Sequence, residues 1–151
     1  MTANSRLTTG VHALCWIEQA RRRGESPLSS ERVAASLRSH PVLVRRLLGE
    51  LRRAGLVEST RGPGAGWTLT KDPKSITLRD VHVALGSEPV FGLHPHEPNL
   101  QCEVGVGIGP VLGDFYAHVD AVVAEELATR TVADVLDQVL AEHPSERSAR
   151  S

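Results

Sequence analysis

The sequence predicts a mainly α-helical protein with one small β-hairpin. Apolar residues recur every three or four positions in several segments, which is the period of one helix face. Three alternate glycines in the stretch RGPGAG (61–66) separate two short extended runs, and a further helical pattern occupies residues 110–140. With 151 residues the chain can bury a core of its own. Because aromatic residues are few, that core must consist mainly of Leu, Val and Ala.

Three helices are expected before residue 55. The first is amphipathic and ends near Gly24, ahead of Pro27. Ser29 and Ser30 can cap a short second helix, because their hydroxyl groups accept hydrogen bonds from free amides in its first turn. A third helix begins at Ser39-His40-Pro41, since proline is tolerated in the first turn. Its expected inward side chains are Val44, Leu47, Leu48 and Leu51, and its outward ones are Arg45, Arg46, Arg52 and Arg53.

The glycine-rich stretch that follows allows two interpretations, a nucleotide phosphate loop or the tip of a hairpin. A phosphate loop requires GxxxxGK[ST], and a dinucleotide fingerprint requires GxGxxG leading from a strand into a helix; neither pattern is present. Gly62, Gly64 and Gly66 instead lie between LVES and WTLT, which both have extended character. Because glycine readily adopts positive φ, these residues are expected at the tip of a hairpin.

The second half of the chain is expected to contain a short helix, a long loop and two further helices. Thr77 with Asp80, and Thr131 with Asp134, have the spacing of helix capping boxes. Residues 87–109 contain three prolines and four glycines without a sustained period, which predicts an irregular loop. From Pro110 an apolar stripe predicts a long helix that needs a partner to cover it. The stripe comprises Val111, Phe115, Val119, Val122, Val123 and Leu127.

Charge is divided unevenly between the two halves of the chain. Residues 1–74 carry 13 basic and 6 acidic side chains, a net charge of +7, whereas residues 75–151 carry 4 and 12, a net charge of −8. A basic half indicates a polyanionic partner such as DNA, although an uneven sequence need not form a surface patch. We find no signal-peptide pattern and no apolar run of membrane-spanning length. A cytoplasmic, nucleoid-associated protein without membrane contact is therefore expected.

The segment 29–54 has the length of a helix-turn-helix, whose second helix presents its N-terminal residues to base edges in the major groove. Arginine can bind guanine O6 and N7 together, and Ser or His can bind phosphate or base. At the hairpin tip, Arg61 is suited to the minor groove, whose negative potential attracts arginine. The alternative is a three-helix core with a solvated basic face and a plain hairpin. The candidate contacts on the second helix and the turn before it are Ser39, His40, Val42, Arg45 and Arg46.

The segment GELRRAGLVESTRGPGAGWTLTKDPKSITLRDV (49–81) resembles the Rrf2 family of bacterial transcription regulators. The matching motifs are LRRAGLV, the wing signature RGxxGG at residues 61–66, KDP and ITLRDV, with Ala65 in place of one glycine. The resemblance covers residues 5–140. It implies a winged helix-turn-helix domain (1–86), a sensor loop (87–109), a dimerisation helix with a short final helix (110–140) and a flexible tail (141–151).

The resemblance also implies a homodimeric DNA-binding regulator, a repressor, that binds a near-palindromic operator in double-stranded DNA. The alternative function is a winged-helix protein-interaction module without specific DNA binding. An enzyme is not expected, because nothing supplies an oxyanion hole or an orienting acid at recognisable spacing around Cys102 and the histidines His94 and His96. The expected DNA contacts are Ser29, Ser39, His40, Pro41, Val42, Arg45, Arg46, Arg61, Gly62 and Gly64.

Many members of this family hold an iron–sulfur cluster through three cysteines in the loop, whereas here the loop has only Cys102. One thiolate cannot hold a cluster that ordinarily takes four ligands, so we expect no cluster and no other cofactor. Cys102, with His94 and His96 nearby, can be an ordinary loop residue, a redox-sensing thiol or part of a metal site, for which the zinc spacing is incomplete. Cys15 is expected to be a small core residue of the first helix.

Overall fold

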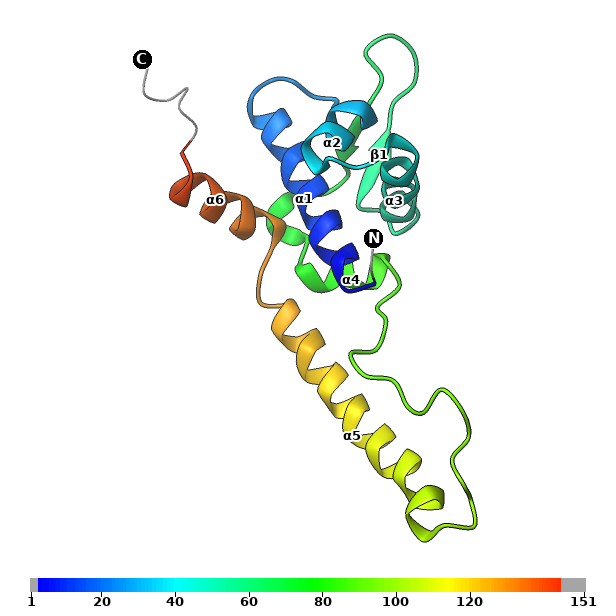
Figure 1. Cartoon of the computed structure of the whole chain (residues 1–151). Helices are drawn as coiled ribbons and strands as arrows, with labels where there is room; N and C mark the ends of the chain where they lie inside the picture. The colour runs from blue at the N-terminus through cyan, green and yellow to red at the C-terminus, as the bar shows by residue number, and fades with distance from the viewer. Residues whose placement is uncertain (1–2, 145–151) are drawn as a thin grey trace.

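The protein is mainly helical with one two-stranded hairpin, as the sequence predicts (Figure 1). The structure, a computed structural model, describes residues 3–144. Three helices precede the hairpin and three follow it, with a short 3-10 turn after the second strand. In chain order the elements are α1 (Ala3–Arg22), α2 (Ser30–Leu37), α3 (Pro41–Arg53), β1 (Val57–Ser59), β2 (Trp67–Leu69), η1 (Pro73–Ser75), α4 (Leu78–Ala84), α5 (Glu103–Leu127) and α6 (Val132–Glu142).

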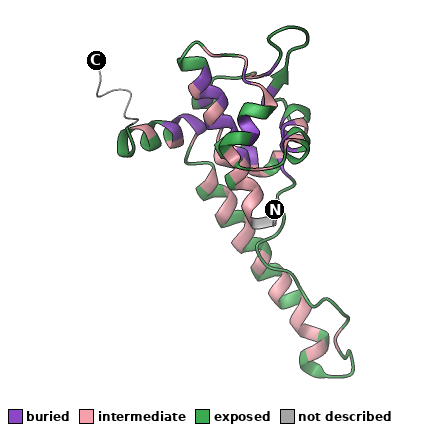
Figure 2. Ribbon diagram, turned by 45° about the horizontal axis from the view of Figure 1, so that its top comes forward, coloured by how far each residue is buried: buried purple, intermediate pink, exposed green. Residues whose placement is uncertain are grey.

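One aliphatic core joins α1 to α4, the hairpin and α6, and Figure 2 shows the buried residues gathered in this part of the molecule. The four residues of α3 that were expected to point inward are all buried. The last helix returns to the same core, because Val132 and Leu136 of α6 are buried against it. We call this part, α1 to α4 with the hairpin and α6, the body.

Local signals set the starts of most helices. The Ser29 side chain accepts a hydrogen bond from the Arg32 amide and so caps α2, and Pro41 occupies the first turn of α3. Both expected capping boxes are present, since in each the threonine hydroxyl and the aspartate carboxylate bind the other residue's amide at 2.9–3.1 Å. These side chains satisfy amides that have no partner within the helix, which fixes where α4 and α6 begin.

The hairpin pairs β1 with β2 in antiparallel register, with Val57 opposite Leu69. Gly62 and Gly64 have positive φ, as expected at the tip. Gly66 does not, and the reason for glycine here is different. A Cβ atom at this position would lie 2.7 Å from the carbonyl group of Leu28. Two hydrogen bonds of 2.8 and 3.1 Å join Leu28 to Trp67, so the hairpin is attached to the segment immediately before α2.

The loop after α4 is shorter than expected, because the helix expected from Pro110 begins at Glu103 and contains Pro110. The loop was predicted to extend to residue 109 because the segment is rich in glycine. At Gly105 a Cβ atom would lie 2.1 Å from the carbonyl oxygen of Asn99, so this glycine permits a close approach within a helix rather than marking a loop. The loop runs along α5: the Val90 amide donates to Asp120, 2.9 Å away.

The helix α5 extends away from the body, on the side opposite the hairpin tip (Figure 1). None of its residues is buried, and large apolar side chains of the expected stripe are exposed, including Phe115 at 59%. Of the expected tail, residues 141 and 142 belong to α6, and residues 145–151 lie outside the described part of the chain. No helix among residues 3–144 combines the length and apolar character needed to cross a membrane.

Candidate nucleic-acid interface

The outward face of α3 combines apolar and cationic side chains. Val42 is 51% exposed, and Arg45 and Arg46 are exposed one turn further along the helix. This face exists because the inward positions are occupied by the buried leucines and valine of the core, which fix the rotation of α3 about its axis. The helix therefore presents its first two turns, the part that a helix-turn-helix inserts into the major groove, to solvent.

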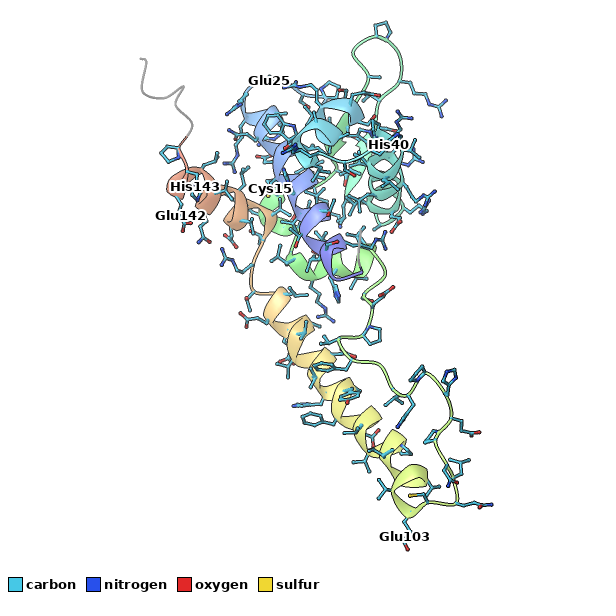
Figure 3. All side chains as sticks on the ribbon, in the orientation of Figure 1. Cys15, Glu25, His40, Glu103, Glu142 and His143 are labelled. Carbon is cyan, nitrogen blue, oxygen red and sulfur yellow. The ribbon has the colours of Figure 1, made fainter. Side chains whose placement is uncertain are left out.

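The turn between α2 and α3 presents hydrogen-bond donors at the start of α3. The exposed His40 is the N-cap of α3, and its Nδ1 accepts a hydrogen bond of 3.2 Å from the Val42 amide (Figure 3). A neutral imidazole has one accepting and one donating nitrogen, so this bond leaves the proton on Nε2. The Nε2–H group can therefore donate to an anion. Before it, Arg38 has a left-handed backbone and an exposed side chain.

Most of the cations near this face have no internal partner. Arg46, Arg53 and Arg61 form no ion pair with an acidic side chain within the part of the chain that the structure describes. Arg45 pairs with Glu31 at 3.5 Å, but both side chains are more than half exposed, and exposed pairs contribute little. These guanidinium groups can exchange water for phosphate or base edges at small cost.

The hairpin is held against α3 by Arg52, whose role the sequence did not reveal. Its Nη1 donates to Ser59 Oγ at 3.3 Å, and its Cζ lies 6.0 Å from the centre of the Trp67 ring. The helical period identified Arg52 only as an outward residue, because the contact depends on where the hairpin packs. Together with the Leu28–Trp67 pairing, this contact fixes the hairpin relative to both α2 and α3.

The predicted contact residues occupy two neighbouring parts of the molecule. One part is the start of α2 with the turn and first two turns of α3, and the other is the hairpin tip, which extends beyond these helices (Figure 1). Both parts lie at the end of the body opposite α5. The first part contains Ser29, Ser39, His40, Pro41, Val42, Arg45 and Arg46, and the second contains Arg61, Gly62 and Gly64.

The two cysteines lie in opposite environments. Cys15 is buried, and burial raises the pKa of its thiol to about 11. Cys102 is exposed at the start of α5, where the backbone amides of Gly105 and Val104 lower the pKa of its thiol. The structure does not bring Cys102 together with the two loop histidines, and among the described residues no three His, Cys, Asp or Glu side chains form a group that could hold a metal ion.

Comparison with known proteins identifies relatives along almost the whole chain. The model of the Rrf2 family, described as an iron-dependent transcriptional regulator, matches residues 3–138. YwnA of Bacillus subtilis (strain 168), which carries the name of an HTH-type transcriptional regulator, is 35% identical over 138 residues, or 90% of this chain and 98% of YwnA. The HTH-type transcriptional regulator CymR of the same organism is 32% identical over 117 residues, or 76% of this chain and 82% of CymR.

Solved structures show the same fold. The structure of CymR, the global cysteine regulator of B. subtilis, has a TM-score of 0.60 at 28% identity and covers 87% of this chain and 95% of CymR. The structure of T. potens IscR has a TM-score of 0.68 at 24% identity, with 93% of this chain and 90% of IscR covered.

Proposed function

This chain belongs to the Rrf2 family of transcriptional regulators, and we propose that it is a repressor that binds a near-palindromic DNA operator as a homodimer. DNA-binding regulation rather than enzymatic activity is the function of the family and of these relatives. The observation that carries the proposal is the outward face of α3. There the exposed Arg46 and Arg53 form no ion pair among the described residues, Arg45 has only an exposed pair with Glu31, and His40 at the N-terminus can donate a hydrogen bond.

The contacts within each half-site follow from the chemistry of these side chains. Arg45 and Arg46, on the first two turns of α3, reach guanine edges in the major groove. His40 donates from Nε2 to a backbone phosphate, and Ser29 and Ser39 lie where hydroxyl groups can donate to neighbouring phosphates. Pro41 sets the first turn of α3 and so directs this end of the helix toward the groove.

The hairpin acts as a wing that reaches the minor groove. Arg61 lies exposed at its tip, and no acidic side chain in residues 5–144 neutralises it. Gly62 and Gly64 are exposed, and the space around them is open, so the backbone of the tip can approach the sugar–phosphate chain closely. The negative potential of the minor groove attracts an arginine in this position, and this attraction does not depend on contact with a specific base.

Dimerisation through α5 supplies the two-fold symmetry that a near-palindromic operator requires. The projecting α5 helix exposes Val111, Phe115 and Val122 on one side, and large apolar side chains gathered in this way mark an interaction surface. A second copy of α5 would cover that surface. In this division of the chain, residues 1–86 bind DNA and the segment 87–109 is the sensor loop. Residues 110–140 form the dimer contact, and the last of them return to the body as α6.

We further propose that this regulator works in the cytoplasm without an iron–sulfur cluster. A cluster ordinarily takes four thiolate ligands, and the whole chain has two cysteines. Of these, Cys15 is buried in the core with a pKa of about 11, so it is not a thiolate at neutral pH. The residues present do not fit the cofactor, and a redox role for the single exposed thiol, Cys102, stays a prediction.

A binding experiment tests the function. Fluorescently labelled genomic fragments, including the region upstream of the chain's own gene, are titrated with the protein at increasing salt. We expect one fragment to bind far more tightly than the rest and the triple substitution of Arg45, Arg46 and Arg61 by Ala to abolish that preference. Arg79→Ala, an exposed arginine on α4, is the matched control and should bind normally. Equally weak affinity for every fragment would disprove specific DNA binding and favour a protein-interaction module.

A further inference from the structure

Three residues run along the centre of the outward face of α3: Val42, Arg46 and Gly49. Their spacing of four and then three residues places them on one side of a helix, opposite the buried Val44 and Leu51. Val42 is 51% exposed, whereas Gly49 presents no side chain at all. Along this line the apolar Val42 and the bare backbone of Gly49 thus lie on either side of the cationic Arg46.

The fold does not require glycine at position 49. A Cβ atom there would meet no heavy atom within 4 Å, and the backbone is helical rather than left-handed. Glycine inside a helix is destabilising relative to alanine. The chain therefore keeps a residue that weakens α3 although its own packing would accept a methyl group. A partner that approaches this face closely accounts for the glycine.

The charge around the face suits DNA as that partner. Arg46 and Arg53 lie on the same side of α3 without acidic partners in the described chain, as a surface for a polyanion requires. Within the major groove, the apolar feature of a base edge is the 5-methyl group of thymine. Val42 and Gly49 are about 10 Å apart along the helix, roughly three base-pair steps.

We infer that Val42 contacts the 5-methyl group of a thymine in each operator half-site, and that Gly49 leaves the space in which the groove approaches α3. This inference rests on the proposed DNA-binding function and specifies what the site reads. Arginines contribute affinity for phosphate and guanine, whereas the valine adds discrimination for thymine through an apolar contact that no charge can replace.

The test uses uracil, which differs from thymine only by the missing methyl group. The full chain selects its preferred duplex from a random-sequence library, and each thymine of that duplex is then replaced singly by deoxyuridine. Burial of one methyl group predicts an affinity loss of about fourfold at one thymine in each half-site. Val42→Ala should bind the thymine and uracil duplexes equally. Val139→Ala, a 48% exposed valine on α6, is the matched control and should retain the difference.

Gly49→Ala provides a second, independent readout. We expect its melting temperature to rise while its affinity for the selected duplex falls at least about threefold, because a helix-stabilising methyl group occupies the space needed by DNA. If Gly49 has only a structural role, its substitution should change the melting temperature and the affinity in the same direction, or leave the affinity unchanged.

The outcomes separate this inference from the proposed function. If a duplex is enriched but every uracil replacement is tolerated, or if Val42→Ala keeps the thymine preference, the thymine contact is wrong and DNA binding stands. If Gly49→Ala binds as tightly as the parent, the close approach at Gly49 is wrong. If no sequence is enriched at all, both the inference and the proposed function fail.

Discussion

Gly66 in the hairpin lies directly against the backbone of Leu28, so that a Cβ atom at position 66 would be 2.7 Å from both the carbonyl carbon and oxygen of Leu28. Neither atom can move easily, because Leu28 is hydrogen-bonded to Trp67 in both directions. This contact links the hairpin to the segment immediately before α2. A substitution of Gly66 alone should therefore disturb it.

Gly66→Ala should lower the free energy of unfolding by about 2–4 kcal/mol, because the added methyl group must displace backbone. Urea denaturation followed by circular dichroism measures the loss. Gly92→Ala is the control, since no atom lies within 4 Å of its added Cβ, and it should change stability by less than about 0.5 kcal/mol. A stable Gly66→Ala variant would contradict the close contact.

The buried carboxylate of Glu18 supports a second prediction. It is 1% exposed and accepts hydrogen bonds from Arg21 and Arg22 at 2.8–3.0 Å. The hydrogen bond from Arg21, more than any other interaction, lowers the pKa of Glu18 from its usual 4.5. Because the folded pKa is the lower one, this interaction stabilises the fold above the unfolded pKa and is lost as pH falls through the folded pKa.

Glu18→Gln should therefore destabilise the protein by about 1–3 kcal/mol at pH 7, and the difference from the parent should shrink below about pH 4. Thermal melts across a pH series measure both effects. Asp137→Asn removes the exposed partner of Arg22 and should cost under about 1 kcal/mol at any pH. A pH-independent difference for Glu18→Gln would show that packing, not charge, explains the loss.

The two thiols should react at very different rates. Cys102 is exposed and the amides of Gly105 and Val104 lower its pKa, so a larger fraction is thiolate at neutral pH than for an ordinary cysteine. Cys15 is buried and its pKa is raised to about 11. Titration with a disulfide reagent should label one thiol rapidly and the second only after unfolding. Cys102→Ser should abolish the fast phase; if Cys15→Ala abolishes it instead, the assignment is wrong.

Salt dependence should report the phosphate contacts one residue at a time. The logarithm of affinity should fall linearly with the logarithm of salt concentration, because binding releases counterions. Arg53→Ala should reduce the slope by about one if Arg53 neutralises a phosphate, whereas Arg46→Ala should weaken binding with the slope unchanged, because Arg46 is proposed to contact a guanine edge. Fluorescence anisotropy at several potassium chloride concentrations gives the slopes. An unchanged slope with weaker affinity would assign the arginine to a base edge.

The exposed stripe of α5 predicts the effect of a charge placed within it. Phe115→Asp puts a carboxylate where the second α5 helix would lie, so the protein should become monomeric, with its helical content unchanged. Light scattering after size-exclusion chromatography measures the mass, and operator affinity should fall at least about tenfold. Val139→Asp on α6 should leave both unchanged. A dimeric Phe115→Asp variant would place the subunit contact elsewhere.

Features that depend on neighbours in sequence were predictable. The capping boxes at Thr77 and Thr131, the cap at Ser29 and the inward leucines of α3 follow from local hydrogen bonding and helical period, and the structure confirms them. Family resemblance added the wing and its relation to the helix-turn-helix. The sequence thus predicted the elements that carry the candidate interface but not the contacts within it, and the DNA contacts themselves stay a prediction.

Features that depend on distant contacts could not be predicted. Gly66 and Gly105 have the same signal as any turn glycine, yet each permits a backbone from elsewhere in the chain to lie close. The contact of Arg52 with the hairpin, and the return of α6 to the core, require knowledge of how elements pack. For the same reason, the sequence alone indicates no role for Gly49, because that role is inferred from the absence of neighbouring atoms around it in the folded chain.

The long α5 helix also acts as a lever. Its 25 residues span about 37 Å, and the loop is fastened to it by Asp120 and by the contact of Phe91 with Tyr116. A tilt of about 10° at Leu127 would therefore move the end near Cys102 by about 6 Å. In a dimer joined through these helices, a small angular change at the junction with the body would alter the distance between the two DNA-reading helices, and the spacing of the operator half-sites would in turn restrict that angle.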